Sequence, residues 1–184
     1  MSTRSKYSFW RLLIWVCLII TVSWGFAEAQ RTLDPSVSGP QLIVNPECIR
    51  LSVSKLKNTN IVFDGSGFKS GDSIFITLIG EKDVKAIVAE APIKPDGTFK
   101  TQVPPLTRFM EILKAEVTFN EKFENVIVIT QPPIPKGVYT AKVTSMLSNL
   151  TAETKMTVKG PSVIDRLKDW IGKLTGKIEH RKTK

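Results

Sequence analysis

Side chains that could do chemistry are few in this chain. The one histidine, His180, lies close to the C-terminus. A Ser-His-Asp or Cys-His catalytic arrangement therefore cannot be formed among the residues that precede it. A zinc site built on histidine is excluded from that region for the same reason.

Four aspartates, Asp64, Asp72, Asp83 and Asp96, lie in or beside predicted turns. A pair of carboxylates can catalyse hydrolysis as acid and base, as in glycosidases. Aspartates in turns, however, usually accept hydrogen bonds from the turn backbone. The spacing of the acidic residues indicates no calcium site. We therefore expect no catalytic residues, no metal site and no cofactor.

Cysteine chemistry is limited in the same way. Cys17 lies inside an apolar run near the N-terminus, and Cys48 is the one cysteine that follows it. Cleavage after Ala29, as expected of a signal peptide, would leave Cys48 as the single cysteine, which cannot form a disulfide within its own chain. We expect Cys48 to be buried and inert, and the alternative is a disulfide with Cys48 of a second copy.

A glycine-rich turn, residues 64–72, organises the central part of the chain. Its three glycines allow backbone angles that other residues reach only with strain. Phe68 lies between them and is expected to close the end of a core. The next segment, residues 74–79, approximately alternates apolar and polar residues, which indicates a half-buried strand. A phosphate-binding loop would lead into a helix and end in Gly-Lys-Ser/Thr, and this turn does neither.

Further strands are expected on both sides of this turn. The segments with strand character are 42–44, 48–53, 60–63, 84–91, 98–103, 115–119, 126–130, 138–144 and 151–158. A short helix is expected within residues 107–114. Many short strands separated by turn signals are typical of a β-sandwich. The sequence therefore predicts one all-β domain over residues 41–160, an antiparallel β-sandwich.

Three motifs resemble bacterial immunoglobulin-like domains of the IPT/TIG type. They are Gly65-Ser-Gly-Phe-Lys-Ser-Gly-Asp-Ser-Ile74, Pro95-Asp-Gly-Thr-Phe99 and Pro135-Lys-Gly-Val-Tyr-Thr-Ala141. The resemblance covers roughly residues 40–160 and implies an immunoglobulin-like fold. Such domains are mostly structural or binding modules, so the resemblance implies a fold more than a function. The chain departs from the pattern between Val103 and Pro135, which is longer than a simple sandwich requires.

The N-terminal segment has the three parts of a secretory signal peptide. Residues 1–11 are basic, residues 12–26 are mostly apolar, and Ala27-Glu28-Ala29 offers small residues at a cleavage site. We expect cleavage after Ala29, followed by a flexible lead-in over residues 30–40. The alternative is an uncleaved anchor, although the apolar run is short for a span of about 20 residues.

Positive charge is concentrated at the two ends of the chain. The formal net charge is +9, of which residues 1–29 contribute +2 and residues 162–184 contribute +4. The predicted domain is therefore nearly balanced. Nucleic-acid binding requires a basic patch on the fold itself, so we expect no nucleic-acid partner.

An amphipathic helix is predicted after Gly160-Pro161, with Ser162 and Asp165 spaced as a capping box. An apolar stripe recurs at helical spacing, with Val163 and Trp170 beside it; its members are Ile164, Leu167, Ile171, Leu174 and Ile178. The residues expected to face away from it are Arg166, Lys168, Asp169, Lys173 and Lys177. The helix and its basic end form the last region, residues 161–184.

Three partners for the apolar stripe remain open at this point. The stripe can pack onto the sandwich, lie on an anionic membrane surface with Trp170 at the interface, or pair with another helix. The candidate docking residues in the last two cases are Ile164, Leu167, Trp170, Ile171, Lys173, Leu174 and Lys177.

Together these features predict an exported, non-enzymatic, immunoglobulin-like module. It would be secreted or periplasmic, associated with the cell envelope, and would act in adhesion or as an accessory subunit. Its partner would be an envelope protein or glycan, or a membrane surface reached through the helix. The alternative function is a carboxylate-based hydrolase of envelope polymers that uses Asp64, Asp72 or Asp96.

Overall fold

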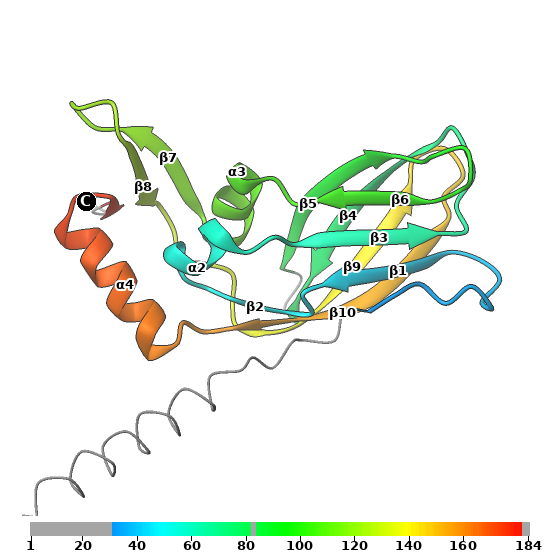
Figure 1. Ribbon diagram of the computed structural model, residues 1–184, viewed down its shortest axis with the longest axis horizontal. Coiled ribbons are helices and arrows are strands. Elements are labelled where there is room, and N and C mark those ends of the chain that lie inside the picture. Colours follow the sequence, from blue (N-terminus) through cyan, green and yellow to red (C-terminus); the bar gives the residue numbers. More distant parts are fainter. Residues whose placement is uncertain (1–30, 82–83, 182–184) are drawn as a thin grey trace, which may run out of the picture.

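The alternating segments of the sequence form strands in a computed structural model that describes residues 31–81 and 84–181 (Figure 1). The described chain is mostly β, with antiparallel and mixed sheets and a helix near the C-terminus. The predicted signal segment and Asp83 lie outside the described residues.

Two sheets carry most of the predicted strands. One has the order β1-β3-β6 and is antiparallel throughout; its strands are β1 (Gln41–Asn45), β3 (Val62–Ser66) and β6 (Phe99–Gln102). The other has the order β2-β10-β9-β4-β5; its strands are β2 (Cys48–Arg50), β10 (Thr151–Lys159), β9 (Gly137–Ser145), β4 (Ser73–Ile79) and β5 (Lys85–Pro92). Its strands pair antiparallel except β2 with β10, which are parallel.

The apolar side chains predicted to share a face are buried in one core. Ile74, Ile76 and Leu78 of β4 are almost fully buried, while the alternate residues of this strand are only partly covered. The core continues through residues of the neighbouring strands, among them Phe63, Phe99, Tyr139, Ala141, Val143, Met156 and Val158. The period-two pattern therefore located the buried face correctly.

The glycine-rich turn closes one end of this core as predicted. Phe68 is buried, and its ring meets that of Phe99 edge-on, with 5.5 Å between the centroids. Gly67 has a φ of +79°. A Cβ on Gly67 would lie 2.1 Å from the carbonyl oxygen of Gly39, so no other residue fits there without backbone movement.

A third sheet accounts for the long segment between Val103 and Pro135. Its order is β11-β8-β7, with β7 (Ala115–Phe119) antiparallel to β8 (Asn125–Ile129) and β11 (Ile178–His180) parallel to β8. Before it come the short helix α3 (Pro105–Thr107) and the π-helical turn η2 (Arg108–Ile112), where one helix was predicted.

Two helices differ from the prediction. The predicted strand 48–53 ends at Arg50, and α2 (Val53–Asn58) follows because the Ser52 hydroxyl accepts a hydrogen bond from Lys55 N at 3.3 Å. The C-terminal helix, α4 (Val163–Leu174), is shorter than expected.

The prediction that Ile178 belongs to the stripe of the C-terminal helix is wrong. Gly176 adopts a φ of +68°, which ends the helical region and turns the chain back. Ile178 then enters β11 and is buried. Figure 1 shows α4 running beside the third sheet, at the end of the molecule away from the glycine-rich turn.

Candidate functional site

Helix α4 is attached to the rest of the molecule through its polar face. The Asp169 carboxylate accepts hydrogen bonds from Ser52 Oγ at 3.1 Å, Val53 N at 3.2 Å and Ser54 N at 2.9 Å. These are the groups at the N-terminus of α2, where a carboxylate stabilises free N–H groups and the positive end of the helix dipole. One helix thus caps another.

A second aspartate of α4 is also turned away from solvent. Asp165 forms the predicted capping box: its carboxylate accepts from Ser162 N at 2.9 Å, and Ser162 Oγ accepts from Asp165 N at 3.2 Å. The hydrogen bond from the Ser162 side chain lowers the pKa of Asp165, and the charges of Arg50 and Lys55 act in the same direction against the effect of burial. Asp165 therefore stays ionised at neutral pH.

Gly172 lies on the same inward face as the two aspartates. A Cβ at this position would lie 2.7 Å from Ile178 Cδ1, so glycine allows β11 to pass close to the helix. Asp165, Asp169 and Gly172 are spaced at i, i+4 and i+7, which places them on one side of a helix. This face, rather than the apolar one, meets the body of the protein.

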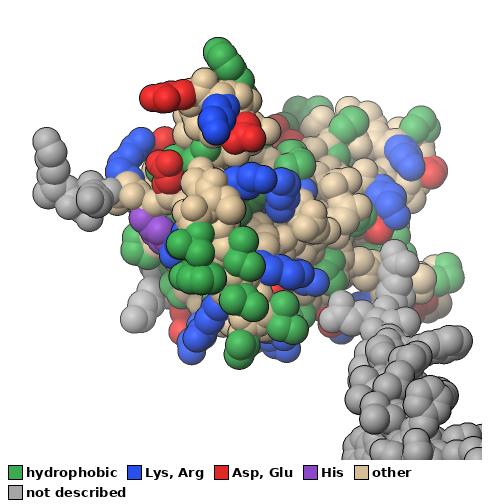
Figure 2. All heavy atoms as spheres, turned by 60° about the vertical axis from the view of Figure 1, so that its left-hand side comes forward, with side chains coloured by type: hydrophobic (Ala, Val, Ile, Leu, Met, Phe, Trp, Pro, Cys, Tyr) green, Lys and Arg blue, Asp and Glu red, His purple; other side chains and the backbone are tan. Residues whose placement is uncertain are grey.

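The apolar face of α4 points outward. Its six residues are Val163, Ile164, Leu167, Trp170, Ile171 and Leu174, and their exposed fractions run from 48% for Ile171 to 83% for Val163. Figure 2 shows hydrophobic side chains gathered on this end of the molecule, with lysine and arginine side chains around them. The possibility that the stripe packs onto the sandwich is therefore not realised in the structure.

Basic side chains border the apolar face on both sides. At 100° per residue, Arg166 and Lys173 fall on one flank of α4 and Lys168 on the other, and all three are exposed. Because Asp165 and Asp169 are turned inward, every exposed charge on α4 is positive. Of the predicted docking residues, Lys177 alone lies beyond the helix, between α4 and β11.

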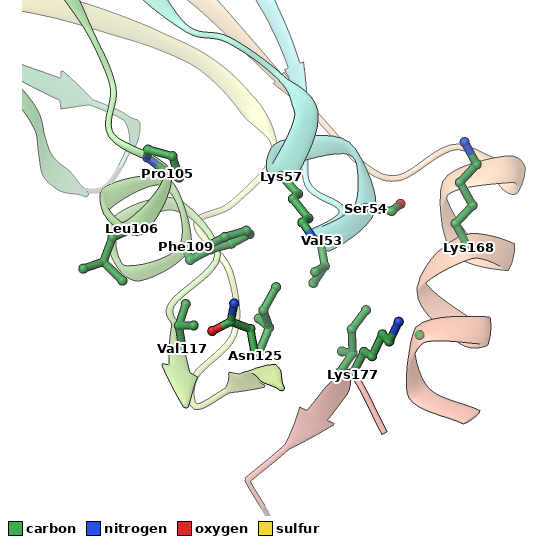
Figure 3. A pocket seen from close by; sticks show the side chains of 13 residues that line it. Val53, Ser54, Lys57, Pro105, Leu106, Phe109, Val117, Asn125, Lys168 and Lys177 are labelled. Carbon is green, nitrogen blue, oxygen red and sulfur yellow. The ribbon is translucent and has the colours of Figure 1, made fainter. Parts of the chain in front are cut away.

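An apolar pocket of about 420 Å³ adjoins the inner side of α4 (Figure 3). It lies between α2, α3, η2, the third sheet and α4. Its lining residues are Val53, Ser54, Lys57, Pro105, Leu106, Phe109, Val117, Asn125, Ile127, Lys168, Gly172, Lys177 and Ile178. The charged residues of this lining are three lysines, and it contains no acidic residue.

Arg108 fixes the side of the pocket that Phe109 forms. The guanidinium of Arg108 is buried, and its Nη1 donates to the carbonyl oxygens of Leu56, at 2.8 Å, and Thr59. These carbonyls lie at the C-terminal end of α2, where a cation is favoured by the helix dipole. Burial lowers the pKa of Arg108, although arginine remains charged at any ordinary pH.

The pocket could not be predicted from the sequence. Its lining residues come from several segments far apart in the chain, which only the fold brings together. One local signal for the orientation of α4 was present, however: two aspartates and a glycine share one helix face, and short residues of this kind permit close approach to another element.

The candidate catalytic carboxylates each have a local structural role. Asp72 is buried and accepts hydrogen bonds from Ser73 N, Leu147 N and Ser148 N, at 2.7, 3.0 and 2.9 Å. Burial alone would raise the pKa of Asp72, but these bonds and one from the Ser148 hydroxyl outweigh it and lower the pKa to about 2.

The remaining candidates are also engaged with neighbours. Asp96 accepts from Thr98 N and Thr98 Oγ1 within the predicted hairpin turn, and Asp64 pairs with Lys100 at 3.2 Å. Within residues 31–81 and 84–181, no three His, Cys, Asp or Glu side chains are grouped as a metal site would require.

Cys48 is less protected than expected. It is half-buried in β2 and has a free thiol, so the prediction that it is buried is wrong. The reason is its place in a three-residue strand at the edge of the five-stranded sheet, where only Ile49 points into the core. A disulfide with a second copy stays a prediction.

No protein-family model matches the chain, and no curated protein matches it in sequence. Among solved structures, macromomycin is similar at a TM-score of 0.39 and 12% identity, over 65% of this chain and 99% of that chain. A TM-score of this size shows neither a shared fold nor a shared function. None of the described helices is long and apolar enough to cross a membrane.

Proposed function

We propose that this protein is an exported, non-enzymatic module of the cell envelope that docks on an anionic membrane surface through α4. The observation that carries the proposal is the inverted orientation of this helix. The carboxylates of Asp165 and Asp169 accept hydrogen bonds from Ser162 and from the N-terminus of α2. The apolar face of α4 and the side chains of Arg166, Lys168 and Lys173 are exposed.

The proposed target follows from the arrangement of these groups. A helix that lies in a membrane interface buries an apolar face among the acyl chains and directs lysines and arginines toward headgroups. Trp170 on that face is the residue type that prefers this boundary. Each cation near an anionic surface contributes about 1 kcal/mol, so Arg166, Lys168 and Lys173 together favour anionic over neutral lipid by roughly a hundredfold.

The body of the module is proposed to be an immunoglobulin-like sandwich. The strand order supports this, since β1, β3 and β6 can be aligned with strands A, B and E of such a fold. In the second sheet β10, β9, β4 and β5 can be aligned with strands G, F, C and C′, and β2 is an additional edge strand beside β10. Tyr139 adds support: its hydroxyl donates to the Pro135 carbonyl at 2.8 Å, as in the tyrosine corner of such folds. The sandwich would offer its loops and edges to an envelope protein or glycan.

A flotation assay with lipid vesicles tests the docking proposal. The chain from Gln30 is suitable, because the described core lies entirely between Leu42 and Ile178. It should float with anionic vesicles and stay behind with neutral ones. Leu167→Glu, which places a carboxylate on the exposed apolar face, should abolish flotation. Ile87→Glu, at a similarly exposed apolar residue of β5, is the matched control and should float normally.

Two results would refute the proposal. One is flotation of Leu167→Glu with anionic vesicles as efficiently as the unsubstituted protein. The other is equal binding to neutral and anionic vesicles, which would mean that Arg166, Lys168 and Lys173 play no part.

A further inference from the structure

The pocket on the inner side of α4 has the chemistry of a ligand site, and it is separate from the outer face proposed to dock on a membrane. The buried side chains of Val53, Phe109, Ile127 and Ile178 form its apolar lining. Small-molecule sites are typically apolar concavities of about 300–1,000 Å³ with a few polar groups at defined places. The pocket volume of about 420 Å³ is within this range. A protein helix, about 10 Å in diameter with its side chains, would not fit into it, so a small molecule is the better candidate.

The charged and polar side chains of the pocket lining indicate which head group a ligand would carry. Figure 3 shows Lys57 reaching from α2 along the pocket toward Val53, and Lys177 directed into the gap between β11 and α4. Lys168 contributes its aliphatic stem, while its ammonium group points away from the pocket. No acidic residue lines the pocket to neutralise these cations. Ser54 and Asn125 add a hydroxyl and an amide to the lining.

We infer that this pocket binds a single-chain amphiphile with an anionic head, and specifically a medium- to long-chain fatty acid. The acyl chain would lie against Phe109, Val117 and Ile127, and the carboxylate would be held by Lys57 and Lys177. An apolar chain is required by the lining, and a negative head by the lysines at its edge. A neutral or cationic head would leave these lysines without a partner.

Calorimetric titration with three matched probes tests this inference. The probes are decanoate, decanol and decylamine, each below the concentration at which it forms micelles. Decanoate should bind at one site, at least tenfold more tightly than either other probe. Dodecanoate should bind more tightly still, by up to about fifteenfold, because each additional buried CH₂ strengthens binding by about fourfold.

Substitutions locate the binding site. Val117→Phe fills the pocket from the half-buried face of β7 and should reduce decanoate affinity at least tenfold. Val138→Phe makes the same change at an exposed residue of β9 and should leave affinity unchanged. The double substitution of Lys57 and Lys177 by Gln should remove the preference for decanoate over decanol, whereas Lys155→Gln on β10 should preserve it. Equal urea midpoints for these variants would show that they remain folded.

Ligand binding in the pocket and membrane docking through α4 use different residues and can be measured separately. Leu167→Glu should lose vesicle binding and keep decanoate binding, since Leu167 does not line the pocket. Absence of decanoate binding, equal affinity for decylamine, or decanoate binding that Leu167→Glu abolishes and Val117→Phe spares would each overturn the inference. The last result would place the probe on the outer face of α4.

Discussion

At the scale of single residues, Asp72 shows how a turn motif is connected to a distant part of the chain. It belongs to the glycine-rich turn, yet its carboxylate also accepts hydrogen bonds from Leu147 N and Ser148 N in the β9–β10 connection. A carboxylate that holds two loops together in this way is most effective when ionised.

Asp72 therefore predicts a defined dependence of stability on pH. Its pKa is about 2 in the folded protein and about 3.9 when unfolded, so its contribution is complete above pH 4 and lost as pH falls toward 2. Urea midpoints measured between pH 2 and pH 6 should show this loss. Asp72→Asn should lower the midpoint at pH 6 and flatten the profile between pH 4 and pH 2. An unchanged slope would mean that other carboxylates cause the loss.

Replacing each of two glycines of the same turn by alanine should lower stability by different amounts. Gly67 and Gly71 both have positive φ, but a Cβ on Gly67 would clash with the Gly39 backbone, whereas one on Gly71 would meet nothing within 4 Å. Gly71→Ala should lower the free energy of unfolding by about 1 kcal/mol, because alanine is strained in the left-handed conformation. Gly67→Ala should lower the free energy of unfolding by at least about 2 kcal/mol more, because the backbone at Gly39 must move to make room for the Cβ. Chemical denaturation measures both, and equal losses would contradict the predicted clash.

At the scale of elements, the orientation of α4 is decided by a few polar contacts. An amphipathic helix normally turns its apolar side inward. Here Asp165, Asp169 and Gly172 form the inward side, and Asp169 supplies hydrogen bonds that α2 would otherwise lack. The described residues leave the apolar face of α4 uncovered, and the proposed docking on a membrane would bury it.

Removing the Asp169 contact should weaken both helices together. Asp169→Ala deletes the acceptor for Val53 N and Ser54 N, and loss of a helix cap costs about 1–2 kcal/mol. Hydrogen exchange should speed up in α2 and in α4. Asp169→Asn, which keeps one acceptor oxygen, should be intermediate. Faster exchange confined to α4 would show that α2 does not depend on this cap.

Elements with local signals were predicted well from the sequence, and elements that depend on distant partners were not. The glycine-rich turn, the β9–β10 hairpin and the start of α4 at Ser162 follow from short-range chemistry. β11 was missed because three residues form a strand only when β8 lies beside them. For the same reason Ile178 was assigned to the helix, although a left-handed Gly176 lies before it.

At the scale of the whole molecule, the structure has two ends of different character. One end carries the glycine-rich turn and the β9–β10 connection, and the other carries the third sheet, α2 and α4 (Figure 1). The exposed apolar face of α4 and the lysine-edged pocket both belong to the second end. We propose that this end meets the membrane and that the sandwich is held away from it for other partners.

The fluorescence of Trp170 reports directly on whether α4 docks on an anionic membrane. In the chain from Gln30 it is the only tryptophan, because the others are Trp10, Trp15 and Trp24. With 55% of its surface exposed, it should emit as a hydrated indole in buffer. Anionic vesicles should shift its emission to the blue, neutral vesicles should not, and high salt should reverse the shift. Emission that is already blue in buffer and unchanged by anionic vesicles would contradict docking through α4.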